Sequence, residues 1–139
     1  MKIFIYCITV LILIVIGYID FKHKIISNKF VLVVGCVGFI NILFDIKNIK
    51  VYLLSALVVF IFFLITAILS NGGIGGGDIK LFTALSLIFG KDIYSVISFT
   101  YIIAFIVSII MLLLKKSNLK SSVALAPYIT LGTLTYLIF

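Results

Sequence analysis

The chain contains the run Gly72-Gly73-Ile74-Gly75-Gly76-Gly77-Asp78-Ile79-Lys80-Leu81, with long apolar segments on both sides. Half of the ten glycines lie in six consecutive residues of this run, 72–77, and Asp78 follows them directly. A carboxylate at the edge of a bilayer is costly, so it is a candidate functional residue. Glycines beside it allow another backbone to approach closely. The run is therefore suited to place the Asp78 carboxylate beside an extended peptide. Catalysis on that peptide would need a second carboxylate close to Asp78.

The composition indicates an integral membrane protein. Of the 139 residues 65% are hydrophobic, and the mean hydropathy is +1.46. These values predict an all-α, polytopic membrane protein, with residues 1–139 as a single membrane-embedded domain and no separate soluble domain. The formal charge of +7 is spread too thinly for a nucleic-acid surface, and anionic lipid headgroups explain it better.

The apolar segments predict about six transmembrane helices, at residues 3–19, 30–44, 51–70, 79–90, 93–114 and 121–139. The first segment lacks a small-residue cleavage site, so we expect a retained helix and not a cleaved signal peptide. The fourth segment is short enough to be re-entrant, which is the alternative topology.

Lysine positions favour six spans over the re-entrant alternative. With six spans, one membrane face holds Lys22, Lys24, Lys29, Lys80, Lys115, Lys116 and Lys120, and the other holds Lys2, Lys47, Lys50 and Lys91. A re-entrant fourth segment would remove this asymmetry. The positive-inside rule then places the lysine-rich face in the cytoplasm.

This topology places Asp20 and Asp78 at the same cytoplasmic edge of the membrane. Two neighbouring carboxylates can share one proton, so that one acts as a general base on water and the other as a general acid. Helix capping or interfacial anchoring, with Asp78 as an N-cap, is an alternative, and an ion or proton pathway is another. Asp45 and Asp92 have lysine neighbours and are expected to be solvated turn residues.

The other motifs in the sequence do not indicate a nucleotide-binding, metal-binding or redox site. The glycine run lacks the spacing of a P-loop or of a dinucleotide-binding fingerprint, although Gly72/Gly76 and Gly73/Gly77 fit the weakly specific GxxxG packing pattern. No CxxC pair is present, Cys7 and Cys36 lie in apolar segments, and the single histidine, His23, lies in a basic loop. We therefore expect no metal site and no cofactor.

Three segments resemble type IV prepilin peptidases, a family of membrane aspartyl proteases. The run ending in Gly75-Gly76-Gly77-Asp78-Ile79-Lys80-Leu81 resembles the GxGD motif of that family. Asp20-Phe21-Lys22 followed by Ile26-Ser27-Asn28 is similar to its first motif, except that Ser27 replaces the usual proline. Ala126-Pro127-Tyr128 with Gly132 is similar to the pattern of its last helix. The chain lacks the methyltransferase region and the four-cysteine element of bifunctional members, so it resembles the short, protease-only form.

The resemblance implies an aspartic endopeptidase of the cell membrane, with Asp20 and Asp78 as the catalytic pair at the cytoplasmic face. It implies prepilin, pseudopilin or competence-pilin substrates, whose short basic leader is removed, and no cofactor. Residues expected at the substrate-binding loop are Gly75, Gly77, Lys80, Lys22, Asn28 and Pro127. The alternatives are a GxGD protease with other membrane substrates and a non-enzymatic protein, such as a small transporter or an assembly subunit.

Overall fold

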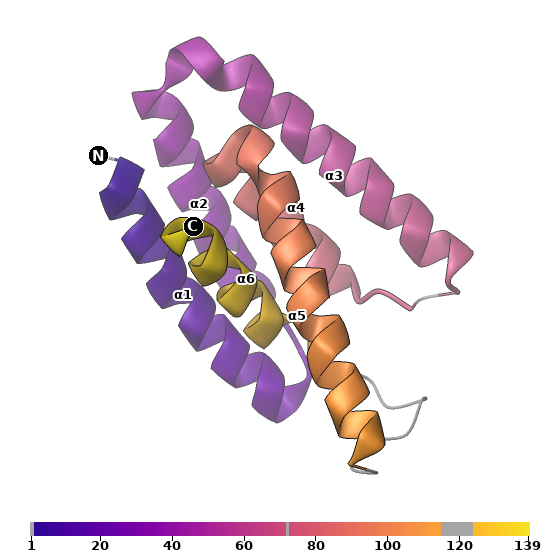
Figure 1. Ribbon diagram of the computed structural model, residues 1–139. Helices are drawn as coiled ribbons and strands as arrows, with labels where there is room; N and C mark the ends of the chain where they lie inside the picture. Colours follow the sequence, from indigo (N-terminus) through magenta and orange to yellow (C-terminus); the bar gives the residue numbers. More distant parts are fainter. Residues whose placement is uncertain (1, 72, 115–123) are drawn as a thin grey trace.

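The computed structural model describes residues 2–71, 73–114 and 124–139, which form an all-helical chain without a strand (Figure 1). The six α-helices are α1 (Lys2–His23), α2 (Asn28–Phe44), α3 (Ile49–Leu69), α4 (Gly76–Phe89), α5 (Ile93–Leu113) and α6 (Ala126–Ile138). Two short 3-10 helices, η1 (Ile46–Asn48) and η2 (Gly90–Asp92), make the tight turns after α2 and α4. The all-α prediction is confirmed.

Apolar helices long enough to cross a bilayer confirm a polytopic membrane protein. Three helical stretches meet this criterion, at Lys2–His23, Ile46–Leu69 and Gly76–Leu113, and the apolar helix Asn28–Phe44 is shorter. Helices α4 and α6 have 14 and 13 residues, and each is about 20 Å long at 1.5 Å per residue. Because this is less than the thickness of the hydrocarbon core, six complete crossings stay a prediction.

Successive helices run in opposite directions, so the turns gather at two ends of the molecule (Figure 1). The end formed by the end of α1 and the starts of α2, α4 and α6 is called here the glycine-run end. The opposite end holds the N-terminus, the two 3-10 turns and the C-terminus. Helix α4 packs between α2 and α3, and α6 packs between α1 and α5. The core therefore centres on α4, whose fully buried side chains include Leu81, Phe82, Leu85 and Ile88.

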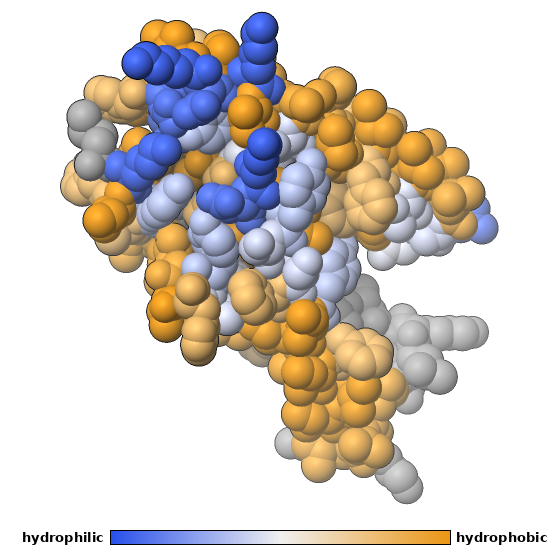
Figure 2. All heavy atoms as spheres, turned by 45° about the horizontal axis from the view of Figure 1, so that its top comes forward, coloured by the Kyte–Doolittle hydropathy of each residue, from blue (hydrophilic) through white to orange (hydrophobic). Residues whose placement is uncertain are grey.

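Polar and apolar residues separate on the surface as a membrane requires. Figure 2 shows hydrophilic residues gathered over the opposite end and hydrophobic residues along the helix flanks. The exposed residues at the opposite end include Lys47, Lys50, Lys91 and Asp92. Four lysines of the other predicted face, Lys22, Lys24, Lys29 and Lys80, are exposed at the glycine-run end. Lys115, Lys116 and Lys120 lie outside the described residues.

Two of the helix boundaries that differ from the sequence expectation lie next to Asp20 and Asp78. Helix α1 continues past residue 19 to His23 because cationic side chains stabilise the C-terminal end of a helix. It ends where Lys24 adopts the left-handed conformation, with φ 53°. Helix α4 already begins at Gly76, so Asp78 lies in its first turn. The N-cap of α4 is Gly75, so the N-cap alternative for Asp78 is wrong.

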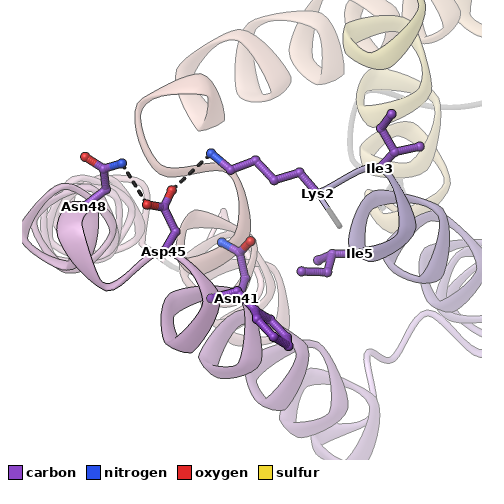
Figure 3. A pocket seen from close by; sticks show the side chains of 7 residues that line it. Lys2, Ile3, Ile5, Asn41, Asp45 and Asn48 are labelled. Carbon is purple, nitrogen blue, oxygen red and sulfur yellow. Dashed lines mark hydrogen bonds and ion pairs between the residues drawn. The ribbon is translucent and has the colours of Figure 1, made fainter.

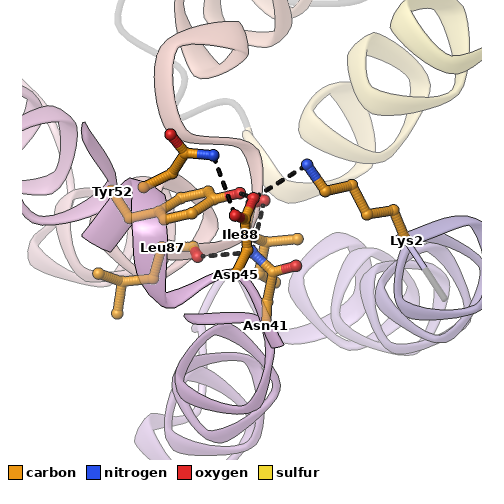
Figure 4. Close-up of polar contacts among 7 residues, drawn as sticks. Lys2, Asn41, Asp45, Tyr52, Leu87 and Ile88 are labelled. Atoms are coloured by element: carbon orange, nitrogen blue, oxygen red, sulfur yellow. Dashed lines mark hydrogen bonds and ion pairs between the residues drawn. The ribbon is translucent and has the colours of Figure 1, made fainter. Parts of the chain in front are cut away.

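The carboxylate of Asp45 joins α1 to the α2–α3 turn at the opposite end (Figures 3 and 4). It forms an ion pair with Lys2 at 3.0 Å and accepts hydrogen bonds from the Asn48 amide and the Tyr52 hydroxyl, both at 2.9 Å. These contacts, led by the hydrogen bond from Lys2, lower the pKa of Asp45 below 3.8. The Asp45 side chain is only 18% exposed, so the expectation of a solvated turn residue is wrong here. Asp92 is exposed in the turn η2, as expected for a solvated turn residue, and it accepts a hydrogen bond from Tyr136.

Asn41 closes the end of α4 from the neighbouring helix α2. Its side-chain amide donates to the carbonyl oxygens of Ile88 at 3.1 Å and Leu87 at 3.3 Å (Figure 4). Carbonyls in the last turn of a helix lack hydrogen-bond donors within that helix, and the Asn41 amide supplies the missing donor. Gly90 then reverses the chain in the left-handed region, with φ 57°. The opposite end is thus fastened by side chains from three helices.

Candidate active site

Asp20 is a buried acid in the last turn of α1. Its side chain is 4% exposed, and Oδ2 accepts a hydrogen bond from the backbone amide of Ala126 at 3.0 Å. Ala126 is the first residue of α6, so this carboxylate lies at the positive end of that helix. At the end of α1, the Asp20 carbonyl oxygen accepts the Lys24 amide at 2.7 Å.

A close approach of α1 and α6 makes this contact possible. A Cβ atom on Gly17 would lie 3.2 Å from Oγ1 of Thr130 and 3.3 Å from Cα of Pro127. The Thr130 hydroxyl also donates to the Leu13 carbonyl at 2.9 Å. Glycine at position 17 therefore lets the start of α6 lie against α1, one turn before Asp20.

Asp78 lies near a backbone turn made of glycines. A Cβ atom on Gly75 would lie 2.9 Å from Oδ2 of Asp78, and the Gly75 amide donates to the carboxylate. An acidic side chain in the first turn of a helix commonly accepts such a hydrogen bond from the backbone amide of the N-cap residue. The other oxygen, Oδ1, is buried and has no hydrogen-bond partner among the described residues.

The remaining glycines of the run have different neighbours. A Cβ atom on Gly77 would lie 2.9 Å from Cβ of Ile26, in the segment that follows α1. Gly76 faces open space, with no atom within 4 Å of such a Cβ. Gly73 lies outside α4, so the Gly73/Gly77 pair does not share one helical face, and Gly72 of the other GxxxG pair lies outside the described residues. Gly77 thus joins the Asp78 turn to the segment after Asp20.

The structure brings the two candidate acids together at the glycine-run end. Asp20 is close enough to Asp78 for their charges to interact. Tyr101 on α5 also interacts electrostatically with Asp78, and its ring stacks on Phe82 with centroids 6.3 Å apart. Side chains from α1, α4 and α5 therefore interact electrostatically at the glycine-run end.

The other residues expected at the site lie at the same end. The Lys80 ammonium donates to Oδ1 of Asn28 at 3.2 Å, joining α4 to the start of α2. Lys22 is exposed on the last turn of α1. Pro127, in the first turn of α6, lines a hollow of about 260 Å³ between α1 and α6. The hollow is mostly apolar and is lined by Ile14, Gly17, Tyr18, Phe21, Pro127 and Thr130.

Comparison with known proteins identifies the family of the chain. A model of the type IV leader peptidase family matches residues 7–115, which include Asp20, the glycine run and Asp78. The chain belongs to the type IV leader peptidase family. The protein is thus a leader peptidase-like protease with membrane helices. No curated protein and no solved structure shows significant similarity to this chain.

Sequence reasoning missed three contacts of this leader peptidase. Ala126 acts through a backbone amide, which no residue type reveals. Ile26 is an ordinary apolar residue whose importance comes from its contact with Gly77. Tyr101 carried little signal of its own, because α5 also contains Tyr94, Thr100 and three serines.

Proposed function

We propose that this leader peptidase is an aspartic endopeptidase that removes the short basic leader of type IV prepilin-like proteins. The approach of Asp20 and Asp78 at one end of the helical bundle carries the proposal. The two acids stand on different helices and yet interact electrostatically, as a proton-sharing pair must. Membership of the type IV leader peptidase family supports removal of a leader peptide as the reaction.

The reaction needs one carboxylate and one carboxylic acid. The base removes a proton from water as the water oxygen attacks the scissile carbonyl carbon, and the acid protonates the carbonyl oxygen. Water supplies the nucleophile, so the aspartates themselves form no covalent bond to the substrate.

The position of the pair suits a substrate that is itself a membrane helix. The apolar hollow beside Pro127 opens next to the helix end that carries Asp20. A prepilin helix lying in the bilayer would approach along α1 and α6, with its leader in the cytoplasm. In the predicted six-span topology Lys115, Lys116 and Lys120 lie on the same face as the glycine-run end, and this lysine bias of the sequence supports a cytoplasmic location for that end.

Co-expression with a candidate prepilin tests the function. Mass measurement of the pilin N-terminus should show cleavage by the wild-type protein and none by Asp20→Asn or Asp78→Asn, which should still insert in the membrane. Asp92→Asn is the matched control, since Asp92 lies in the turn η2 at the opposite end, and it should cleave normally. Full activity of either Asp20→Asn or Asp78→Asn would exclude the aspartic mechanism.

Cysteine labelling tests the location of the site. In a background without Cys7 and Cys36, a cysteine at Ser27 should be labelled only when reagents reach the cytoplasm. A cysteine at Asn48 should be labelled from outside. The reverse pattern would place the glycine-run end outside the cell and contradict a cytoplasmic active site.

A further inference from the structure

Asp20 and Asp78 stand on helices that do not pack extensively against each other. Helix α1, which carries Asp20, packs mainly against α6 and α2, whereas α4, which carries Asp78, packs mainly against α2 and α3. If the two acids act as the pair proposed above, both carboxylates must reach the same peptide bond. A contact other than direct packing of α1 on α4 must therefore set the position of one acid relative to the other.

Residues 24–27, called here the α1–α2 segment, provide such a contact. The segment follows α1, whose last turn carries Asp20. Its Ile26 side chain is half-buried and packs against the hydrophobic core. A Cβ atom on Gly77, the residue before Asp78, would lie only 2.9 Å from Cβ of Ile26. The segment after Asp20 therefore lies directly against the backbone that precedes Asp78.

A hydrogen bond joins the residue after this segment to the same part of α4. The Lys80 ammonium donates to Oδ1 of Asn28, the first residue of α2, at 3.2 Å. Gly77 and Lys80 are three residues apart in α4, so they lie on one face of that helix. Ile26 and Asn28 therefore both contact one face of the first turns of α4, on either side of Asp78 in the sequence.

The α1–α2 segment has few restraints within itself. Its backbone forms neither helix nor strand, and the side chain of Ser27, the N-cap of α2, makes no capping hydrogen bond. Ile25 is exposed. A segment without regular backbone hydrogen bonds opens locally at a lower cost than a helix does. The contacts of Ile26 and Asn28 with α4 are therefore important for keeping the segment in place.

We infer that the hydrogen bond between Asn28 and Lys80 holds the α1–α2 segment on α4 and thereby sets the position of Asp20 relative to Asp78. In the aspartic protease proposed above, on which this role rests, Asn28 and Lys80 are positioning residues and do not bind the substrate. Loss of the bond lets the segment move away from Gly77, and the two carboxylates lose their common geometry. A displacement of about 1 Å in a catalytic group is enough to lower a rate strongly.

Cysteine labelling tests the hydrogen bond without a substrate. In the whole protein in lipid, without the two native cysteines, Ile26→Cys places a half-buried thiol in the α1–α2 segment. Asn28→Leu and Lys80→Met should each raise the rate of labelling by a soluble maleimide at least about threefold, a factor typical of one lost hydrogen bond. The double variant should react no faster than either single variant, because both remove the same bond.

Lys29→Met is the matched control, since it removes another exposed lysine at the glycine-run end. It should leave the labelling rate unchanged. Unchanged labelling in both Asn28→Leu and Lys80→Met would overturn the inference.

Steady-state cleavage of a prepilin then separates positioning from substrate binding. Asn28→Leu and Lys80→Met, with Ile26 intact, should each lower kcat at least about fivefold and leave KM nearly unchanged, because a displaced catalytic group affects the chemical step. A residue that binds the substrate would instead raise KM. Raised KM with normal kcat, or faster labelling with normal cleavage, would overturn the positioning role. A protein that shows the expected labelling but cleaves no prepilin in its wild-type form would contradict the proposed function alone.

Discussion

A Cβ atom on Gly75 would lie 2.9 Å from Oδ2 of Asp78, closer than such an atom normally approaches. Alanine at this position must displace the carboxylate from its present orientation. We therefore expect Gly75→Ala to lower the single-turnover cleavage rate at least about tenfold, which corresponds to about 1.4 kcal/mol in the activation free energy. Cleavage of a prepilin in detergent, with enzyme in excess for single turnovers, measures the effect.

Gly76→Ala is the matched control, since the space around Gly76 is open. Its activity should stay within about twofold of the wild-type value, and its stability should rise slightly, by about 0.4–1 kcal/mol, because alanine restricts the unfolded chain. Equal activity losses in both variants would show that the run only requires flexibility.

The contact between Gly77 and Ile26 predicts a rescue experiment. The β-carbon added in Gly77→Ala would lie 2.9 Å from Cβ of Ile26 and push the segment after α1 away from Asp78. We expect losses of both stability and cleavage rate. Truncating the neighbour in Gly77→Ala/Ile26→Ala should restore part of both, since the two residues are in contact. Purely additive effects in this double-mutant cycle would count against the contact.

The sequence predicts the structure well where a residue type has one common structural role in a membrane protein. Apolar length alone predicts all six helices, and the glycine run with Asp78 alone marks the candidate site. The environment of Asp45 is not predictable in this way, because its partners Lys2 and Tyr52 come from other helices. A turn residue with a lysine close by in sequence looks solvated, and only the packing of α1 shows that it is not.

The helix boundaries at the site are less predictable for a physical reason. Glycine is a poor helix former, so the sequence predicts a loop up to Asp78. In the structure Gly75 is the N-cap, and the helix begins at Gly76. This earlier start allows Asp78 to reach back to the Gly75 amide.

Asn41 should contribute to stability and not to catalysis. Its buried side chain donates to the Ile88 and Leu87 carbonyls, so Asn41→Leu leaves these acceptors without a partner. We expect a loss of about 1–3 kcal/mol in unfolding free energy, with the cleavage rate per folded molecule unchanged. The control Asn48→Ala removes an exposed hydrogen bond and should change stability by less than about 0.5 kcal/mol. Denaturant unfolding in detergent measures both, and a large kinetic defect in Asn41→Leu would contradict this separation.

The lowered pKa of Asp45 predicts the direction of a pH effect on stability. Its folded-state pKa lies below 3.8 because Lys2, Asn48 and Tyr52 donate hydrogen bonds to the carboxylate. The resulting stabilisation is complete above the unfolded-state pKa and is lost as the pH falls through the folded-state pKa. The difference in melting temperature between wild-type protein and Asp45→Asn should therefore shrink as the pH falls below 3.8. A difference that stays constant over this range would mean that the carboxylate charge contributes nothing.

Gly17 should control the active site from one helical turn away. A leucine there would collide with Pro127 and Thr130, and it would push the start of α6, with the Ala126 amide, away from Asp20. We expect Gly17→Leu to lower the cleavage rate at least about tenfold, even in the fraction that stays folded, because Asp20 loses its hydrogen-bond donor. Gly35→Leu in α2 is the matched control, since no atom lies within 4 Å of a Cβ at that position, and it should retain normal activity. Normal cleavage by folded Gly17→Leu would show that the contact between α1 and α6 does not set the geometry of Asp20.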